Sequence, residues 1–412
     1  MKILLIHQYA GNKGDRAVLY SLVQLIKSQD RSAEIVVSTT DPDLWKDFAT
    51  FSYQDVRFIP SAWDFEKLPK SSFYWSVLRK YQKYTFTILR ESFLLNVSRF
   101  FLKFLVNPTF YKELKTCDKV ISVGGHHFTT ILSYDLVSSI NYDAMAVLAM
   151  NKEFICFSQS FGPFDFHKSR NRQLTLKILE SSSALYARED SSEKSLLSFG
   201  VSSSQIRKTY ETVLTLNGLT TTYLKPTQRE KIVGIAIYAT QKREPNVHKN
   251  YVDSISKFCD YVNSKGYKVR FFPMELRNTP PDDRILIHEI MDSITDKSMC
   301  YCYEEDLNTP LHLQEISKCQ LFVGHKTHST IFALACGTPL IGIAYHPKTF
   351  EFMKQYGMEN YCIDDTQLTA LSLNNAFDSL ILDLDKVGVS LYNCSKEKSK
   401  RINDDLKAIL AH

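Results

Sequence analysis

The sequence predicts an α/β protein made of two Rossmann-like domains. Short apolar segments alternate with longer ones in which apolar residues recur every three to four positions, and such βα units build parallel sheets covered by helices. The alternation pauses at a polar stretch, residues 211–231, and then begins again. The 412 residues also exceed the length of one ordinary domain. We therefore expect domains at residues 1–210 and 211–412.

In the first domain, the apolar segment Ile3–Ile6 predicts a buried strand. Residues 15–27 predict a helix, because their apolar side chains follow the 3.6-residue period. Further strands are expected at residues 34–38, 120–123, 154–157 and 184–186, and helices at residues 138–149, 168–181 and 189–199.

The second domain repeats this pattern. Its strands are expected at residues 232–237, 269–272, 299–303, 321–323 and 340–344. The last predicted helix, residues 395–410, is expected to cross back onto the first domain.

A helical insertion at residues 70–115 interrupts the first domain. Between residues 73 and 111 its aromatic residues include Tyr74, Trp75, Tyr81, Tyr84, Phe86, Phe93, Phe100, Phe101, Phe104 and Phe110, and its cations are Arg79, Lys80, Lys83, Arg90, Arg99 and Lys103. Such a segment can lie on an anionic membrane surface or hold a lipid-linked acceptor. A helical hairpin packed on the sheet, with its basic side solvated, accounts for the same residues.

Composition excludes several classes of protein. Hydrophobic residues make up 44% and charged residues 23% of the chain, as in globular proteins. A net charge of +5 is too small to indicate a nucleic-acid partner. Nine scattered cysteines, with only Cys300 and Cys302 close together, predict reduced thiols and no metal site. We find no signal-peptide core and no window of ~20 apolar residues, so a cytoplasmic protein is expected.

The first candidate loop, Gly11-Asn12-Lys13-Gly14-Asp15, follows the first strand. Its two glycines allow the backbone to approach a ligand closely. Asn12 and Asp15 are the candidate functional residues, although a helix N-cap alone accounts for the aspartate. The spacing differs from G-x-G-x-x-G, so a dinucleotide cofactor is poorly supported.

Two further loops follow predicted strands of the first domain. Gly125 precedes His126 and His127 in a loop that can hydrogen-bond a sugar, and a structural turn accounts for these residues about as well. Arg188 falls between a strand and a helix, where it can make a bidentate contact with a carboxylate or phosphate. An ion pair with Glu189 or another acid is the structural alternative.

The most informative loop is Gly324–Ser329, with the residues that follow it to Lys348. It joins a strand to a helix at the edge where parallel sheets bind ligands. Lys326 is a point charge suited to an anion, His328 can act as an acid near neutral pH, and the helix N-terminus at Ser329 adds amides. These groups suit a small, multiply charged acid.

Together the loops resemble the polysaccharide pyruvyl transferase family, in order and over nearly the whole chain. That family has a Gly-Asn-x-Gly-Asp loop, a Gly-Gly loop, a Gly-Pro, an Arg-Glu-x-Ser helix start, a Gly-x-Arg-x-His-Ser signature, a Gly-x-Pro and a Tyr-x-x-Lys. The matching residues are Gly11–Asp15, Gly124-Gly125, Gly162-Pro163, Arg188–Ser191, Gly324–Ser329, Gly337–Pro339 and Tyr345–Lys348. The architecture is similar to GT-B, with two domains facing a cleft, the N-terminal one on the acceptor side.

The resemblance implies transfer of pyruvate from phosphoenolpyruvate to two hydroxyls of one hexose, which forms a cyclic ketal and releases phosphate without a cofactor. The implied catalytic residues are His328, Asp15 and His126, the donor-binding residues are Arg188, Lys326, Ser329 and Lys348, and the acceptor-binding residues are Asn12, Gly125 and His127. His328 would protonate the donor, and Asp15 or His126 would be the base. A lipid-linked acceptor would place the enzyme on the inner face of the plasma membrane.

One departure from the family pattern bears on the donor. Lys326 stands where the family has arginine, and the two are not interchangeable at a bidentate anion site. The acid expected near the domain junction is Glu211. Two alternatives therefore stay open: a GT-B-type glycosyltransferase that uses a nucleotide sugar, and a non-catalytic partner in polysaccharide assembly.

Overall fold

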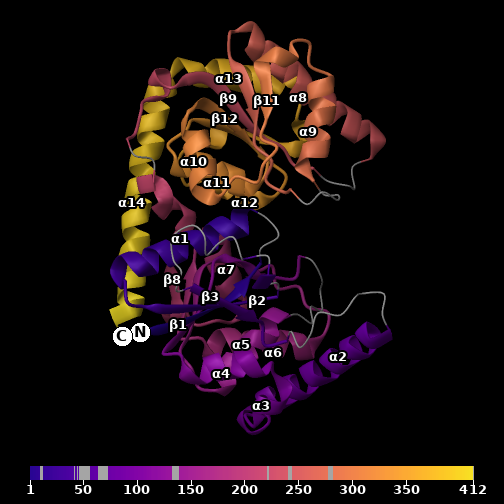
Figure 1. Ribbon diagram of the computed structural model, residues 1–412, viewed down its shortest axis with the longest axis vertical. Helices are drawn as coiled ribbons and strands as arrows, with labels where there is room; N and C mark the ends of the chain where they lie inside the picture. The colour runs from indigo at the N-terminus through magenta and orange to yellow at the C-terminus, as the bar shows by residue number, and fades with distance from the viewer. Residues whose placement is uncertain are drawn as a thin grey trace. The chain divides into compact units, whose positions relative to one another are not determined.

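The computed structural model describes residues 1–9, 13–40, 42–43, 45, 56–63, 73–131, 139–219, 222–239, 244–276 and 282–411. The chain divides into two compact units (Figure 1). Unit 1 comprises Met1–Ala10 and Leu22–Glu211, and unit 2 comprises Gly11–Ser21 and Thr212–His412. The segment after the first strand thus belongs to unit 2, whereas the sequence pattern placed it in the first domain.

Unit 1 is built on a parallel sheet with strand order β3-β2-β1-β4-β6-β7-β8, and β5 pairs with β6. The strands are β1 (Lys2–Gln8), β2 (Glu34–Thr39), β3 (Val56–Pro60), β4 (Lys119–Ser122), β5 (Gly125–Phe128), β6 (Phe154–Phe161), β7 (Ala184–Ala187) and β8 (Ile206–Lys208). The central strand β1 is buried on both faces, which explains its uninterrupted apolar sequence.

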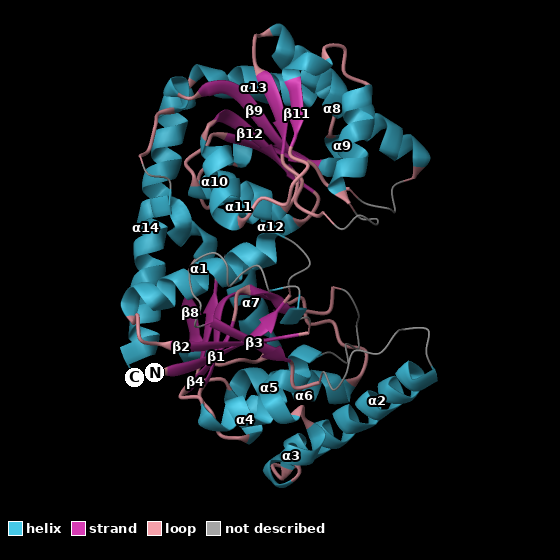
Figure 2. Cartoon of the chain, in the orientation of Figure 1, coloured by secondary structure: helices cyan, strands magenta, loops and turns pink. Residues whose placement is uncertain are grey.

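Helices cover both faces of this sheet (Figure 2). Those in the N-terminal half of the chain are α1 (Lys13–Gln29), α2 (Phe73–Leu94), α3 (Leu102–Leu105), α4 (Pro108–Thr116), α5 (Ser139–Ala149), α6 (Ser169–Ser181) and α7 (Asp190–Phe199), with short 3-10 turns at Ser98–Phe100 and Ser203–Gln205. The core beneath α2 and α5 contains Phe86, Phe110 and Tyr142, each almost fully buried.

Helices α2 to α4 form the predicted insertion. The inner side of α2 packs in the core through Phe86, Leu89 and Phe93. Lys177 of α6 fastens its C-terminal end, because the Lys177 ammonium donates to the Phe93 carbonyl oxygen at 2.7 Å. The packed-hairpin interpretation therefore holds for this inner side of the insertion.

Unit 2 is built on a second parallel sheet, with strand order β11-β10-β9-β12-β13-β14. The strands are β9 (Glu230–Ala236), β10 (Lys268–Phe271), β11 (Cys300–Cys302), β12 (Cys319–Gly324), β13 (Leu340–Ala344) and β14 (Cys362–Asp364). Counted along the chain from β9, this is the 3-2-1-4-5-6 order of the Rossmann fold.

The helices of unit 2 lie on both faces of its sheet (Figure 2). They are α8 (Pro245–Ser264), α9 (Asp283–Asp292), α10 (Thr309–Ser317), α11 (Thr327–Ala335), α12 (Pro347–Lys354), α13 (Ala370–Leu382) and α14 (Leu384–Ala411), with 3-10 turns at Thr212–Leu219, Pro226–Gln228, Lys297–Met299, Glu359–Tyr361 and Asp365–Gln367. Helix α14 packs on α11, where the Ser395 hydroxyl donates to the Leu334 carbonyl oxygen at 2.7 Å. All of α14 belongs to unit 2, and its crossing back onto the first domain stays a prediction.

The predicted α/β fold with two parallel sheets is confirmed. Strands β3, β5, β8 and β14 were not predicted, and α14 begins earlier than expected, at Leu384. All nine cysteines are free thiols. Among the helices of the described residues, none combines the length and the apolar character that crossing a bilayer requires.

Candidate active site

The candidate site of unit 2 lies at the carboxyl edge of its sheet. All six strands are parallel, so the residues that follow them gather along one edge. The strand order changes direction between β9 and β12, and open α/β sheets bind ligands outside the carboxyl ends of strands at such a point. Tyr238 follows β9, and His325 and Lys326 follow β12.

The signature loop is shaped by its own backbone contacts. A Cβ on Gly324 would lie 2.8 Å from the Thr330 hydroxyl oxygen, so only glycine fits at the strand end. The Ser329 hydroxyl donates to the Lys326 carbonyl oxygen at 2.6 Å, and Ser329 is fully buried. Ser329 therefore stabilises the first turn of α11, and its predicted contact with the donor stays a prediction.

Lys326 is oriented by two carboxylates. Its ammonium lies 3.0 Å from both carboxylate oxygens of Asp283 and 3.5 Å from Glu275. Asp283 is fully buried and also accepts the amide hydrogens of Met274 and Glu275. An ammonium has three donors, and the Lys326 side chain is 12% exposed, so the two carboxylates orient this lysine at a partly exposed position.

The described part of the first motif, residues 13–15 at the start of α1, joins the same site. A Cβ added at Gly14 would overlap the imidazole ring of His328, so the glycine makes room for the histidine. Lys13 lies 3.3 Å from Asp306, which also pairs with Arg16 at 2.7 Å. Burial lowers the pKa of Lys13 to about 8.

The two predicted functional residues of this loop have different outcomes. Asp15 lies in the first turn of α1, which begins at Lys13, so the aspartate is inside the helix and is not its N-cap. A carboxylate there is favoured by the helix dipole. Asn12 lies outside the described residues.

Aromatic side chains border Lys326. The rings of Tyr238 and Tyr345 stack with centroids 4.3 Å apart, and the Lys326 ammonium lies 5.8 Å from the Tyr238 centroid. The buried His325 ring contacts the Tyr251 hydroxyl at 2.9 Å and Asp365 at 3.2 Å. His325 is thus a buried histidine that ties together the loops after β12 and β14.

Lys348 stands at the start of α12, after β13. Its backbone amide donates to His346 Nδ1 at 3.2 Å, so His346 caps that helix. A pocket of about 350 Å³ opens beside these residues and is lined by Tyr345, His346, Phe350 and Asp364. The Lys348 side chain is half-buried on the same edge of the sheet as Lys326.

The candidate residues of unit 1 form a second group. His126 and His127 lie in the short strand β5 and not in a loop as predicted, and Arg188 follows β7. The His126 Nε2–H donates to the Gly162 carbonyl oxygen, and the His127 Nε2–H donates to the Val123 carbonyl oxygen at 3.1 Å. A Cβ on Gly125 would lie 2.5 Å from His127 Nε2. His126 and His127 are half-buried, so their exposed edges can meet a ligand.

Arg188 is held in a buried ion-pair network. Its Nε donates to Ser160 at 2.9 Å and to Glu189 at 3.0 Å, and its Nη1 donates to Glu211. The arginine and both carboxylates are almost fully buried. Arg188 therefore forms the ion pair with Glu189 that was the alternative to anion binding, and it also pairs with Glu211.

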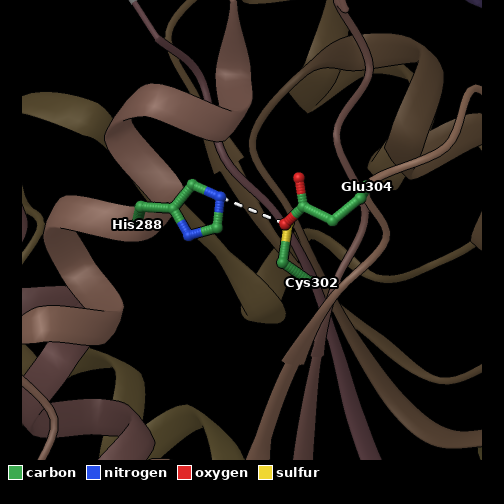
Figure 3. A group of neighbouring side chains, drawn as sticks. All are labelled: His288, Cys302 and Glu304. Carbon is green, nitrogen blue, oxygen red and sulfur yellow. Dashed lines mark ion pairs between the residues drawn. The ribbon is translucent and has the colours of Figure 1, made fainter.

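One group of the described residues could hold a metal ion: His288, Cys302 and Glu304, whose donor atoms lie within 4.8 Å of one another (Figure 3). His288 and Glu304 already form a 3.1 Å ion pair and are 53% and 56% exposed. Burial raises the pKa of the Cys302 thiol to about 12, which opposes the ionisation that a metal–thiolate bond requires.

Sequence analysis did not identify several residues of the unit 2 site. Asp283 resembles an ordinary acid at a helix start, and its partner Lys326 is 43 positions away. Lys13 occupies the variable position of the first motif, and no local pattern connects it with Asp306. Tyr238 follows the end of a predicted strand, and only this position could have indicated it from the sequence.

Comparison with known proteins gives a match along most of the chain. The polysaccharide pyruvyl transferase family profile matches residues 12–347. The amylovoran biosynthesis protein AmsJ of Erwinia amylovora is 23% identical over 386 residues, which cover 88% of each chain.

Solved structures share the fold at low identity. Anabaena HepE in complex with UDP-glucose has a TM-score of 0.61 and 13% identity, covering 100% of this chain and 99% of that one. Staphylococcus aureus MnaA with UDP has a TM-score of 0.60 and 14% identity, covering 100% and 97%. The UDP-GlcNAc 2-epimerase of Neisseria meningitidis has a TM-score of 0.57 and 12% identity, covering 98% and 99%. These likenesses confirm the GT-B-like fold, and because the family profile spans both units, the chain belongs to the polysaccharide pyruvyl transferase family.

Proposed function

We propose that this pyruvyl transferase moves pyruvate from phosphoenolpyruvate to two hydroxyls of one hexose in a cell-surface polysaccharide or its lipid-linked precursor. The observation that carries the proposal is the group of cations at the point where the strand order of unit 2 reverses. Lys326 is fixed there by Asp283, and the same carboxylate acts electrostatically on Lys13. Phosphoenolpyruvate carries a carboxylate and a phosphate close together, and a site with more than one cation suits it.

The donor is proposed to bind unit 2. Lys326 and Lys348 are retained as donor contacts, and Lys13 and Arg16 are added to them because they lie in the same unit and flank Gly14, which contacts the His328 ring. The helix N-terminus of α11 contributes its first amides. Arg188, another donor-binding residue expected from the sequence, lies in unit 1, where Glu189 and Glu211 pair with its guanidinium, and its contact with the donor stays a prediction.

His328 is proposed as the acid that protonates the methylene carbon of the donor, which makes C2 electrophilic. One sugar hydroxyl then forms a C–O bond at C2, the C2–O bond to phosphate breaks, and the second hydroxyl closes the ketal. Of the two hydroxyl protons, one replaces the proton given by His328 and the other leaves with phosphate. Asp15 or His126 is proposed as the base, and Lys326 or Lys348 stabilises the departing phosphate.

The acceptor is proposed to contact Gly125 and His127 in unit 1 and Asn12 in the first loop. Histidine ring edges and a glycine backbone can hydrogen-bond sugar hydroxyls. A lipid-linked precursor as acceptor would hold the enzyme at the inner face of the plasma membrane.

The proposal is tested by isothermal titration of the purified protein with phosphoenolpyruvate, beside UDP-sugars and CMP-sugars. We expect saturable binding of phosphoenolpyruvate that Lys326→Ala weakens at least about tenfold, as the loss of a close charge contact predicts. Lys386→Ala, at an exposed lysine of α14, is the matched control. Binding of a nucleotide sugar alone would favour glycosyl transfer, and binding of neither would favour a non-catalytic partner.

A further inference from the structure

The inserted helices of unit 1 expose an unusual number of apolar side chains. Among the described residues, four phenylalanines are exposed, and three of them are Phe100, Phe101 and Phe104, at 76%, 50% and 67%. Leu95 at 68% and Val97 at 38% adjoin them. We call residues 95–104 the aromatic tip. Its rings are not needed for the core, which is filled by other phenylalanines of the insertion.

Helix α2 continues this surface along its outer side. Val77, Tyr81 and Tyr84 recur at helical spacing and are 48%, 45% and 67% exposed. The opposite side of the helix is the one that packs in the core. An outer side of a surface helix would normally be polar, so apolar residues on both sides indicate a second contact.

The same surface is strongly basic. Lys80, Lys83, Arg99 and Lys103 are all exposed. The Lys103 ammonium lies 4.7 Å from the Phe104 ring centroid, so cation and ring share one place on the surface. Glu91 is the single acid between residues 73 and 111 and pairs with Arg90 at 2.8 Å and with Arg170. The surface therefore offers positive charge with little to offset it.

We propose that the aromatic tip and the outer side of α2 bind the surface of an anionic bilayer. Exposed phenyl rings can enter the boundary between headgroups and acyl chains, while lysine and arginine remain among anionic headgroups. Aromatic rings are more stable at this boundary than in water, and neighbouring lysines can extend their ammonium groups to the hydrated headgroups. Only the purpose of this membrane binding rests on the proposed function: it would bring the active site to a lipid-linked acceptor.

The test is cosedimentation of the purified full chain with vesicles of phosphatidylcholine alone and of phosphatidylcholine with phosphatidylglycerol. We expect binding to the anionic vesicles that salt weakens. Phe100→Ser with Phe104→Ser should lower the partition coefficient by about tenfold or more, as the loss of two inserted rings predicts. Arg99→Glu with Lys103→Glu should abolish the preference for anionic vesicles.

Matched controls are Leu382→Ser and Lys386→Glu, which change an exposed leucine and an exposed lysine outside the insertion. They should bind vesicles as the wild type does. Equal binding by the tip variants, or no binding to anionic vesicles at low salt, would overturn the proposal. Self-association in sedimentation equilibrium that the double phenylalanine variant removes would instead assign the surface to a second copy of the chain.

The outcome can be separated from that of the proposed reaction. Phosphate release with a water-soluble oligosaccharide acceptor should be the same in wild type and tip variants, because the tip carries none of the proposed catalytic residues. Vesicle binding without any pyruvyl transfer would support the proposed membrane surface and reject the proposed reaction. Pyruvyl transfer without vesicle binding would support the proposed reaction and reject the proposed membrane surface.

Discussion

Replacing Lys13 by methionine is expected to make the protein more stable and less able to bind the donor. The Lys13 side chain is only 4% exposed, and burial lowers its pKa from 10.5 to about 8 in spite of the ion pair with Asp306. That difference corresponds to a penalty of about 3 kcal/mol on the ammonium in the folded protein. Methionine has a similar length and carries no charge, and Asp306 keeps Arg16 as a partner.

The pH dependence follows from the direction of the pKa change. Because the folded pKa is below the unfolded value, the unfolded chain binds more protons between pH 8 and pH 10.5, and the stability of the wild type rises across that window. The penalty is fully present below the folded pKa and disappears above the unfolded one. It is absent from the Lys13→Met variant at every pH.

Urea unfolding of both proteins measures the effect. The free energy of unfolding of Lys13→Met should exceed that of the wild type by up to about 3 kcal/mol near neutral pH, and the gap should narrow by about 2 kcal/mol on going to about pH 9.5. Titration with phosphoenolpyruvate should show weaker binding by the variant, with Lys386→Met as a control. A gap that stays constant with pH would refute the reasoning, because only the titration of Lys13 makes it change.

Three further predictions concern the His328 ring, the buried Arg188 network and the need for a metal ion. Gly14→Ala should displace the His328 ring and lower kcat about 100-fold with the fold intact, and an unchanged kcat would remove His328 from the chemistry. Arg188→Met would leave Glu189 and Glu211 buried without their cation, so thermal unfolding should show a loss of about 3–5 kcal/mol, and a smaller loss than about 1 kcal/mol would contradict the buried network. EDTA should leave phosphate release unchanged, because no step of the proposed reaction uses a metal, and a loss of activity that a divalent ion restores would show otherwise.

Much of the fold could be predicted from the sequence because its strands are buried on both faces. Uninterrupted apolar segments such as Ile3–Ile6 and Leu340–Ala344 are typical of central strands in a parallel sheet that helices cover on both sides. Short strands at the sheet edges gave weaker signals. Strand β14, Cys362–Asp364, has only three residues, and they include one aliphatic side chain, Ile363, and one charged side chain, Asp364.

The candidate site was predictable only in part. Loops at strand ends identified Lys326 and His328, since ligand binding at the carboxyl edge of a parallel sheet is a general property of the fold. The carboxylates that position Lys326 come from distant segments, and no spacing along the chain connects them. Arg188 had two interpretations, and only burial and the position of Glu211 show which partners it has.

The assignment of residues 11–21 to unit 2 has a consequence for how the chain can be divided. Lys13, Gly14 and Arg16 are encoded near the N-terminus, yet their partners Asp306 and His328 are encoded some three hundred positions later. A fragment that starts at Thr212 would therefore contain a complete parallel sheet but would lack Lys13, Gly14 and Arg16 of the proposed donor site. Exchange of whole domains between relatives would therefore have to carry residues 11–21 together with the segment that begins at Thr212.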